Sequence, residues 1–128
     1  MVHTRRRHSG FTLIELMVVM VIVAMLLALA APRYFGSLQK SKETALRQTL
    51  SVTRDALDKF YSDKGKYPDS LDVLVSTRYL RSMPIDPLLD SASNWLVVAP
   101  DDPAKGAVSD IHSSAEGLGR DGTVIREW

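Results

Sequence analysis

The sequence contains no cysteine among its 128 residues. Disulfide bonds, cysteine-ligated zinc and thiol catalysis are therefore excluded. A chain of this length is enough for one domain. Without covalent cross-links, that domain must be held by packing, by a bound ion or by neighbouring molecules.

Beyond its first ten residues the chain also lacks an excess of positive charge. Those ten residues contain Arg5, Arg6 and Arg7 and no acid, whereas the whole chain has 16 Lys and Arg residues against 15 Asp and Glu residues. The remainder is thus slightly acidic. Because nucleic-acid-binding domains usually carry a basic patch, the sequence predicts no nucleic-acid partner.

The chain does contain one long apolar run, residues 11–31, which only Thr12 and Glu15 interrupt. As a helix this run would be roughly 30 Å long, which matches the hydrocarbon core of a bilayer. By the positive-inside rule, the arginines before it predict that residues 1–10 stay in the cytoplasm and the rest lies outside. Three interpretations fit: a plain single-pass anchor, a secretory signal peptide cleaved after Ala30, and a pilin-type leader.

Glu15 discriminates among these interpretations. A carboxylate in a membrane helix costs roughly 2.5–3.5 kcal/mol at mid-bilayer and less near the interface. A plain anchor or a signal peptide has no use for it, so an ionisable residue here predicts a function and a partner. The alternative is that its side chain reaches back to the lipid headgroups.

The residues around Glu15 point to that partner. The segment Gly10-Phe11-Thr12-Leu13-Ile14-Glu15-Leu16, behind its short basic leader, resembles the prepilin cleavage motif of type IV pilins and type II secretion pseudopilins. The resemblance implies cleavage after Gly10 by a prepilin peptidase and N-methylation of the new terminus, Phe11. It also implies that Glu15 neutralises the terminal amine of an adjacent subunit, and a buried charge is tolerable when it is paired. Pro32 matches the proline that ends or bends the membrane segment in this family.

The rest of the chain predicts an α+β fold. Apolar side chains recur at helical spacing from Tyr34 to Ser62, so one helix should run from residue 11 to about 63 and stop near Gly65. A short second helix is expected from Leu71 to about residue 79. Three strand-like runs follow, and we expect them to form a small antiparallel sheet packed on the long helix: residues 95–99, 107–111 and 123–126.

Charged residues after the membrane segment have several interpretations. Arg54 and Asp58 lie four residues apart, as do Asp55 and Lys59, and each pair can form an ion pair on the outer face of the helix. Asp110, Glu116 and Asp121 lie in a stretch similar to an abbreviated form of the loop that binds calcium in many major pseudopilins. Two hydroxyl groups lie nearby, those of Ser113 and Ser114. Calcium needs six to eight converging oxygens, while Asp and Gly also dominate ordinary turns. Calcium stays an open alternative, and no cofactor is expected.

Asp110, His112 and Ser114 include the residue types of a hydrolase triad. Alternate residues of a strand line up on one face and do not converge as a triad must. The sequence therefore predicts no enzymatic activity and no catalytic residue.

The resemblance covers nearly the whole chain and implies three segments. Residues 1–10 would be the cleaved leader, residues 11–32 the transmembrane and assembly half of the long helix, and residues 33–128 a periplasmic pilin-like domain. The loop at residues 83–87 is similar to its counterpart in major pseudopilins. A C-terminal cysteine pair, common in the best-known pilins, is absent. Both features favour a pseudopilin.

The expected function is that of a structural subunit of a periplasmic filament that drives protein export in type II secretion. Its expected partners are copies of itself, other pseudopilins, a prepilin peptidase and an assembly platform in the bacterial inner membrane, where the chain would be a single-pass protein. Three alternatives stay open: a minor pseudopilin, a type IV pilin serving adhesion, motility or DNA uptake, and a membrane-tethered periplasmic binding module.

Overall fold

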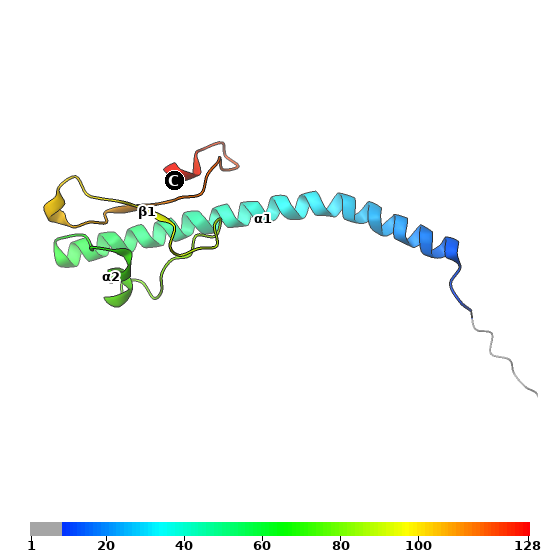
Figure 1. Cartoon of the computed structure of the whole chain (residues 1–128), viewed down its shortest axis with the longest axis horizontal. Helices are drawn as coiled ribbons and strands as arrows, with labels where there is room; N and C mark the ends of the chain where they lie inside the picture. Colours follow the sequence, from blue (N-terminus) through cyan, green and yellow to red (C-terminus); the bar gives the residue numbers. More distant parts are fainter. Residues whose placement is uncertain (1–8) are drawn as a thin grey trace, which may run out of the picture. The chain divides into compact units, whose positions relative to one another are not determined.

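The computed structural model describes residues 9–128, so the three leader arginines lie outside the described residues. Its dominant element is α1, a helix of 52 residues spanning Leu13–Lys64 (Figure 1). The prediction of one long helix is confirmed. The helix ends at Gly65, whose φ of 73° is left-handed and whose amide donates to the Tyr61 carbonyl at 2.8 Å. Glycine adopts this capping conformation without a steric penalty.

Two compact units share α1. Residues up to Ser37 belong to the first unit, and Leu38–Trp128 form the second, which we call the head. In the described part of the first unit the side chains of α1 are almost all exposed. The head, by contrast, has a buried apolar core.

The core of the head is built on one face of α1. Leu46, Leu50, Leu57 and Phe60 follow one another at spacings of four, seven and three residues, which places them on the same side of a helix. All four are at most 5 % exposed. The rest of the head covers this face with a second set of buried apolar side chains: Leu71, Leu74, Trp95, Val108, Ile111, Ala115 and Ile125. Each large side chain buried in this way contributes roughly 1.5–3 kcal/mol.

The second helix, α2, spans Leu71–Ser76 and is shorter than predicted. It stops because Arg78 has a left-handed φ of 64°, and the amide of Tyr79 reaches back to the Leu74 carbonyl at 2.8 Å. The ring of Tyr79 then packs edge-on against Phe60, with 5.3 Å between ring centroids. Tertiary packing of this tyrosine thus replaces the last predicted turn of helix.

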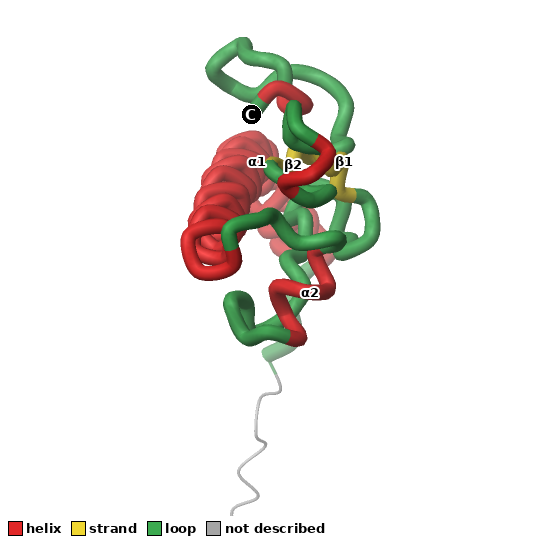
Figure 2. The backbone as a smooth tube through the Cα atoms, turned by 90° about the vertical axis from the view of Figure 1, so that its left-hand side faces the viewer, coloured by secondary structure: helices red, strands yellow, loops and turns green. Residues whose placement is uncertain are grey.

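The sheet has two strands, β1 (Trp95–Val98) and β2 (Asp110–Ser113), and not the three predicted (Figure 2). They are antiparallel, with Trp95 opposite Ser113. The second strand begins later than predicted, because the Val108 amide donates to the Pro68 carbonyl at 3.1 Å. The start of the predicted strand is therefore bonded to the loop before α2. A single 3-10 turn, η1 (Pro103–Lys105), lies between the two strands.

The predicted third strand, residues 123–126, is wrong. After one isolated bridge between Leu118 and Val124, the chain turns into a 3-10 helix, η2 (Ile125–Glu127). The amide of Ile125 donates to the Gly117 carbonyl at 3.1 Å, so the segment bonds to residues just before it. We call residues 114–128 the C-terminal loop.

Candidate functional site

The segment with the cleavage motif lies at the start of α1. Gly10 and Phe11 precede the first helical residue, Leu13, and have no regular secondary structure. Both are exposed, and the Phe11 side chain is 88 % exposed. The bond between Gly10 and Phe11 is thus in a non-helical, accessible stretch, which a protease cleft requires.

Thr12 starts the helix. The amide of Glu15 donates to Thr12 Oγ1 at 3.2 Å, and the amide of Leu16 donates to the Thr12 carbonyl at 3.2 Å. Thr12 and Glu15 therefore stand as the first and last residues of an S/T-x-x-E capping box, a pattern that satisfies free amides at a helix start. The bond described here uses the backbone amide of Glu15 and leaves its carboxylate available for another partner.

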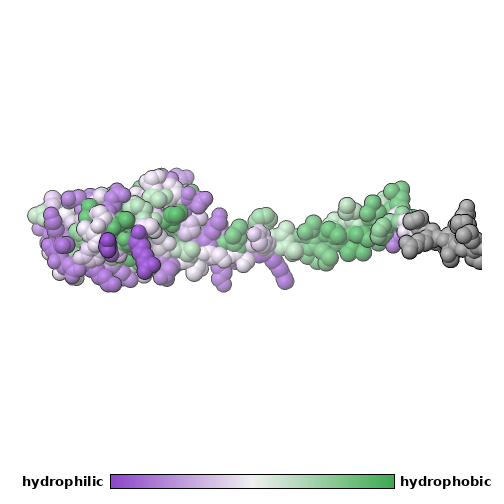
Figure 3. Space-filling model, turned by 90° about the horizontal axis from the view of Figure 1, so that it is seen from below, coloured by the Kyte–Doolittle hydropathy of each residue, from purple (hydrophilic) through white to green (hydrophobic). Residues whose placement is uncertain are grey.

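The surface around Glu15 is apolar. Glu15 is the single charged residue within residues 11–31, and large exposed side chains such as Leu16, Met20 and Leu27 surround the helix. Figure 3 shows this hydrophobic colouring along the N-terminal part of α1, in contrast to the polar surface of the head. By length and composition this part of α1 could cross a membrane, and none of its most apolar window is buried.

Pro32 lies inside α1, which continues to Lys64. Proline removes one backbone donor and crowds the preceding turn, but here it does not end the helix. That the membrane segment ends or bends at Pro32 therefore stays a prediction.

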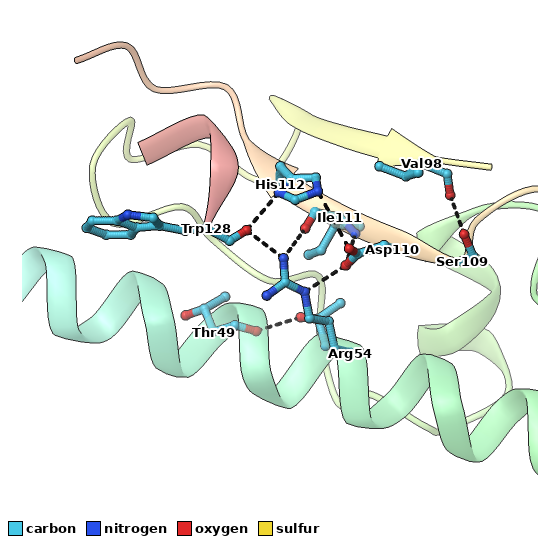
Figure 4. Close-up of polar contacts among 9 residues, drawn as sticks. Thr49, Arg54, Val98, Ser109, Asp110, Ile111, His112 and Trp128 are labelled. Carbon is cyan, nitrogen blue, oxygen red and sulfur yellow. Dashed lines mark hydrogen bonds and ion pairs between the residues drawn. The ribbon is translucent and has the colours of Figure 1, made fainter. Parts of the chain in front are cut away.

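A second polar site joins the head's part of α1 to the C-terminal loop, and Arg54 is at its centre (Figure 4). Its Nε donates to Asp110 Oδ1 at 2.6 Å. Its Nη2 donates to the main-chain oxygens of Ile111 and Trp128 at 2.9 and 2.6 Å. The predicted pairing of Arg54 with Asp58 is wrong, because the guanidinium turns toward β2 and the loop instead of lying along the helix surface.

Arg47, two turns before Arg54 on α1, forms the other half of this site. Its guanidinium carbon lies 4.0 Å from the ring centroid of Trp128, and its Nη2 is bonded to Asp121. Asp121 also accepts hydrogen bonds from the Thr123 amide and hydroxyl. Those two hydrogen bonds, followed by the Arg47 charge, hold the pKa of Asp121 below its usual 3.8 despite some desolvation. A charged Asp121 is thus favoured.

Glu43 continues the same stripe of α1, one turn before Arg47. Its side chain is 8 % exposed and accepts from the Arg120 amide at 3.1 Å and from Gln39 Nε2 at 3.4 Å. Sequence reasoning missed Glu43 and Arg47 and gave Arg54 the wrong partner. The available signal was their shared face at spacings of four and seven residues, in line with the buried leucines.

The three candidate calcium ligands do not converge. Asp110 is paired with Arg54, Asp121 with Arg47, and Glu116 Oε1 with Arg126 Nη2 at 3.3 Å. Within residues 9–128 no group of three or more acidic or histidine side chains is placed to hold a metal ion. Calcium needs six to eight convergent oxygens, so these residues do not fit a calcium site.

The triad-like residues are also separated by role. His112 Nδ1 lies 2.7 Å from the main-chain oxygen of Trp128, and Nε2 lies 3.5 Å from Asp110 Oδ2. Ser114 lies beyond the end of β2, and its carbonyl accepts from Arg126. A nucleophile would have to bond to the imidazole, whereas both imidazole nitrogens face other groups.

Comparisons with known proteins agree with the N-terminal motif. The prokaryotic N-terminal methylation motif matches residues 5–31. The chain is 34 % identical over 99 residues to the type II secretion system core protein G of Pseudomonas aeruginosa, covering 65 % of this chain and 70 % of that protein. It is 37 % identical over 75 residues to the core protein G of Aeromonas hydrophila, covering 56 % of this chain and 52 % of that protein.

A pilin is also similar, over a shorter stretch. The type IV major pilin protein PilA of Myxococcus xanthus is 38 % identical over 63 residues, which cover 49 % of this chain and 29 % of that pilin. No solved structure matches the chain significantly. The core protein G relatives are thus matched over more of their length than the pilin.

Proposed function

The chain belongs to the family of the type II secretion system core protein G, and from that premise we propose that it is a structural subunit of a pseudopilus filament. The observation that supports this most directly is an exposed apolar helix with one acid in its first turn. Such a surface suits lipid before assembly and packing against copies of itself afterwards. The proposed role is structural and not catalytic.

Processing is the first step of the proposal. A prepilin peptidase would cleave after Gly10 and leave Phe11 as a methylated, cationic N-terminus. The apolar part of α1 would then anchor the chain in the bacterial inner membrane, with the head in the periplasm, until an assembly platform transfers it to the filament. The exposed, non-helical backbone at Gly10 is compatible with entry into a protease cleft.

Glu15 sets the register in this proposal. Its carboxylate would pair with the Phe11 amine of a neighbouring subunit, because two unpaired charges in an apolar environment are costly and a pair is tolerable. Sliding one subunit by a helical turn would leave both charges unpaired. The pair therefore favours one axial position over its alternatives. Within one chain the two groups lie about one helical turn apart, so an intrasubunit pair is the competing arrangement.

The test uses two substitutions that separate charge from helix capping. Glu15→Gln retains the capping-box residue type but removes the charge. Glu15→Leu removes both and should insert more readily. We expect both variants to be processed and to stay in the membrane, but to form few filaments and to support little secretion. Val19→Leu, one turn further along and still apolar, is the matched control and should assemble normally.

The outcomes separate charge pairing from helix capping as the role of Glu15. If Glu15→Gln assembled as well as the unchanged chain while Glu15→Leu failed, capping and not charge would be the role of Glu15. If both variants formed normal filaments, the register proposal would be wrong. Disulfide trapping measures directly which positions of neighbouring subunits lie side by side. The chain has no cysteine of its own, so pairs of cysteines can be introduced without background.

The similarity to a type IV pilin supports one alternative, a subunit of a surface pilus. Deletion of the gene separates the two: loss of an exported protein favours secretion, whereas loss of surface fibres, motility or DNA uptake favours a pilus. A minor pseudopilin would be needed in few copies per filament. A tethered binding module would tolerate both Glu15 variants.

A further inference from the structure

We propose that Arg47 and Arg54 connect the C-terminal loop to α1 through an ionic clasp. This clasp takes the place of a bound divalent cation, so that the head folds independently of calcium. The clasp comprises these two arginines with Asp110, Asp121 and Trp128. Nothing in this inference depends on filament formation.

Arg54 is the better-enclosed half of the clasp. Its side chain is 35 % exposed and Asp110 is 37 % exposed. One guanidinium bridges three acceptors that come from two segments: Asp110 and Ile111 in β2, and Trp128 at the end of the C-terminal loop. A calcium ion would join segments in the same way, by collecting a carboxylate and backbone oxygens around one positive centre. The guanidinium supplies directional donors to the same kinds of acceptors.

Arg47 forms the more exposed half, because its side chain is 52 % exposed and that of Asp121 is 47 % exposed. An isolated ion pair at such a surface contributes little. Here the pair is part of a closed set of contacts: Arg47 lies over the Trp128 ring, Trp128 Nε1 donates to Thr123 Oγ1 at 2.6 Å, and Thr123 donates to Asp121. The ring, hydroxyl and carboxylate hold one another, and the arginine connects them to the helix.

The loop is shaped around this ring. At Gly119 a Cβ atom would lie 2.2 Å from the Trp128 side chain, so no larger residue fits without displacing the indole. The Trp128 ring thus lies directly against the backbone of the C-terminal loop at Gly119. The three carboxylates near the loop are also already paired, since Asp110, Glu116 and Asp121 each form an ion pair with a different arginine. A cation at this position would have to displace an arginine from each of these carboxylates.

The experiment measures thermal unfolding of the full-length protein in detergent by tryptophan fluorescence. The chain has two tryptophans, Trp95 and Trp128, and both lie in the head, so the signal reports on the head and not on the membrane helix. The unfolding midpoint is measured with millimolar calcium chloride and with a chelator. The variants are Arg47→Gln and Arg54→Gln, and Arg81→Gln, at an exposed arginine outside the clasp, is the control.

We expect the unchanged chain to give the same midpoint with calcium and with chelator. Arg54→Gln should lower the midpoint by about 10 °C and Arg47→Gln by about 4 °C, since a domain of this size loses roughly 4–8 °C per kcal/mol. Arg81→Gln should stay within about 2 °C of the unchanged chain.

Two results would overturn the clasp. One is a rise of many degrees in the midpoint of the unchanged chain on adding calcium, which would show that the carboxylates bind metal. The other is a midpoint for both clasp variants equal to that of Arg81→Gln. If Arg54→Gln does not fold, Arg47→Gln and the calcium comparison decide. Because no filament is needed, this outcome is separate from that of the Glu15 experiment.

Discussion

Asp86 offers the sharpest test of how the head is held together. Its side chain is fully buried, and within residues 9–128 it forms no salt bridge. It accepts from the Ser113 hydroxyl, which is also fully buried, and from the amides of Leu88 and Leu89 at 2.8 and 3.4 Å. One carboxylate thus joins the loop after α2 to the end of β2.

Asp86→Ala removes every one of these acceptors. A buried donor left without a partner costs about 1–3 kcal/mol, and a hydrogen bond to a charged group contributes about 1.5–3 kcal/mol. Because Ser113 and Leu88 both lose their acceptor, we expect a loss of about 3 kcal/mol in the free energy of unfolding. For a domain of this size that loss lowers the midpoint by more than about 10 °C.

The assay is again tryptophan fluorescence of the full-length protein. Trp95 is well placed for it, because its indole Nε1 donates to the Pro84 carbonyl at 2.9 Å, two residues before Asp86. Asp86→Asn keeps one acceptor oxygen and should fall between the unchanged chain and Asp86→Ala. Asp101→Ala, which removes an exposed acid and changes the net charge equally, is the control. Equal midpoints for Asp86→Ala and Asp101→Ala would refute the reasoning.

Three further outcomes are expected. Mass spectrometry of the membrane-extracted protein should show loss of residues 1–10 and one added methyl group on Phe11; a mature chain starting at Ala31 would instead indicate an ordinary signal peptide. Gly106→Ala should destabilise the head strongly, because φ is 114° there and a Cβ would lie 2.3 Å from a backbone oxygen; an unchanged midpoint would contradict this. The folded-state pKa of Asp121 is lowered from 3.8, so its contribution to stability is present above that pH and is lost as the pH falls through the folded-state pKa. Midpoints measured across this acid range should therefore fall less for Asp121→Asn than for the unchanged chain.

The sequence by itself determined the long helix and the motif at its start. Apolar side chains at helical spacing and a glycine at residue 65 are local signals, and α1 begins and ends within two residues of the predicted positions. The motif at Gly10 and Glu15 is likewise contiguous, so it is readable without knowing the fold. The family relationship rests on these local features and agrees with the comparisons.

Only the tertiary structure decided the arrangement of the head's second half. Residues 123–126 have strand-like composition, but Ile125 bonds to Gly117 and the chain closes into a loop. Arg54 could have paired with a neighbour four residues away, yet its guanidinium meets Asp110 from 56 residues further along the chain. Strand pairing and ion pairing between distant segments depend on which side chains folding brings together, and spacing along the chain does not encode that. The same reason explains why the carboxylates that suggested calcium are instead held by arginines.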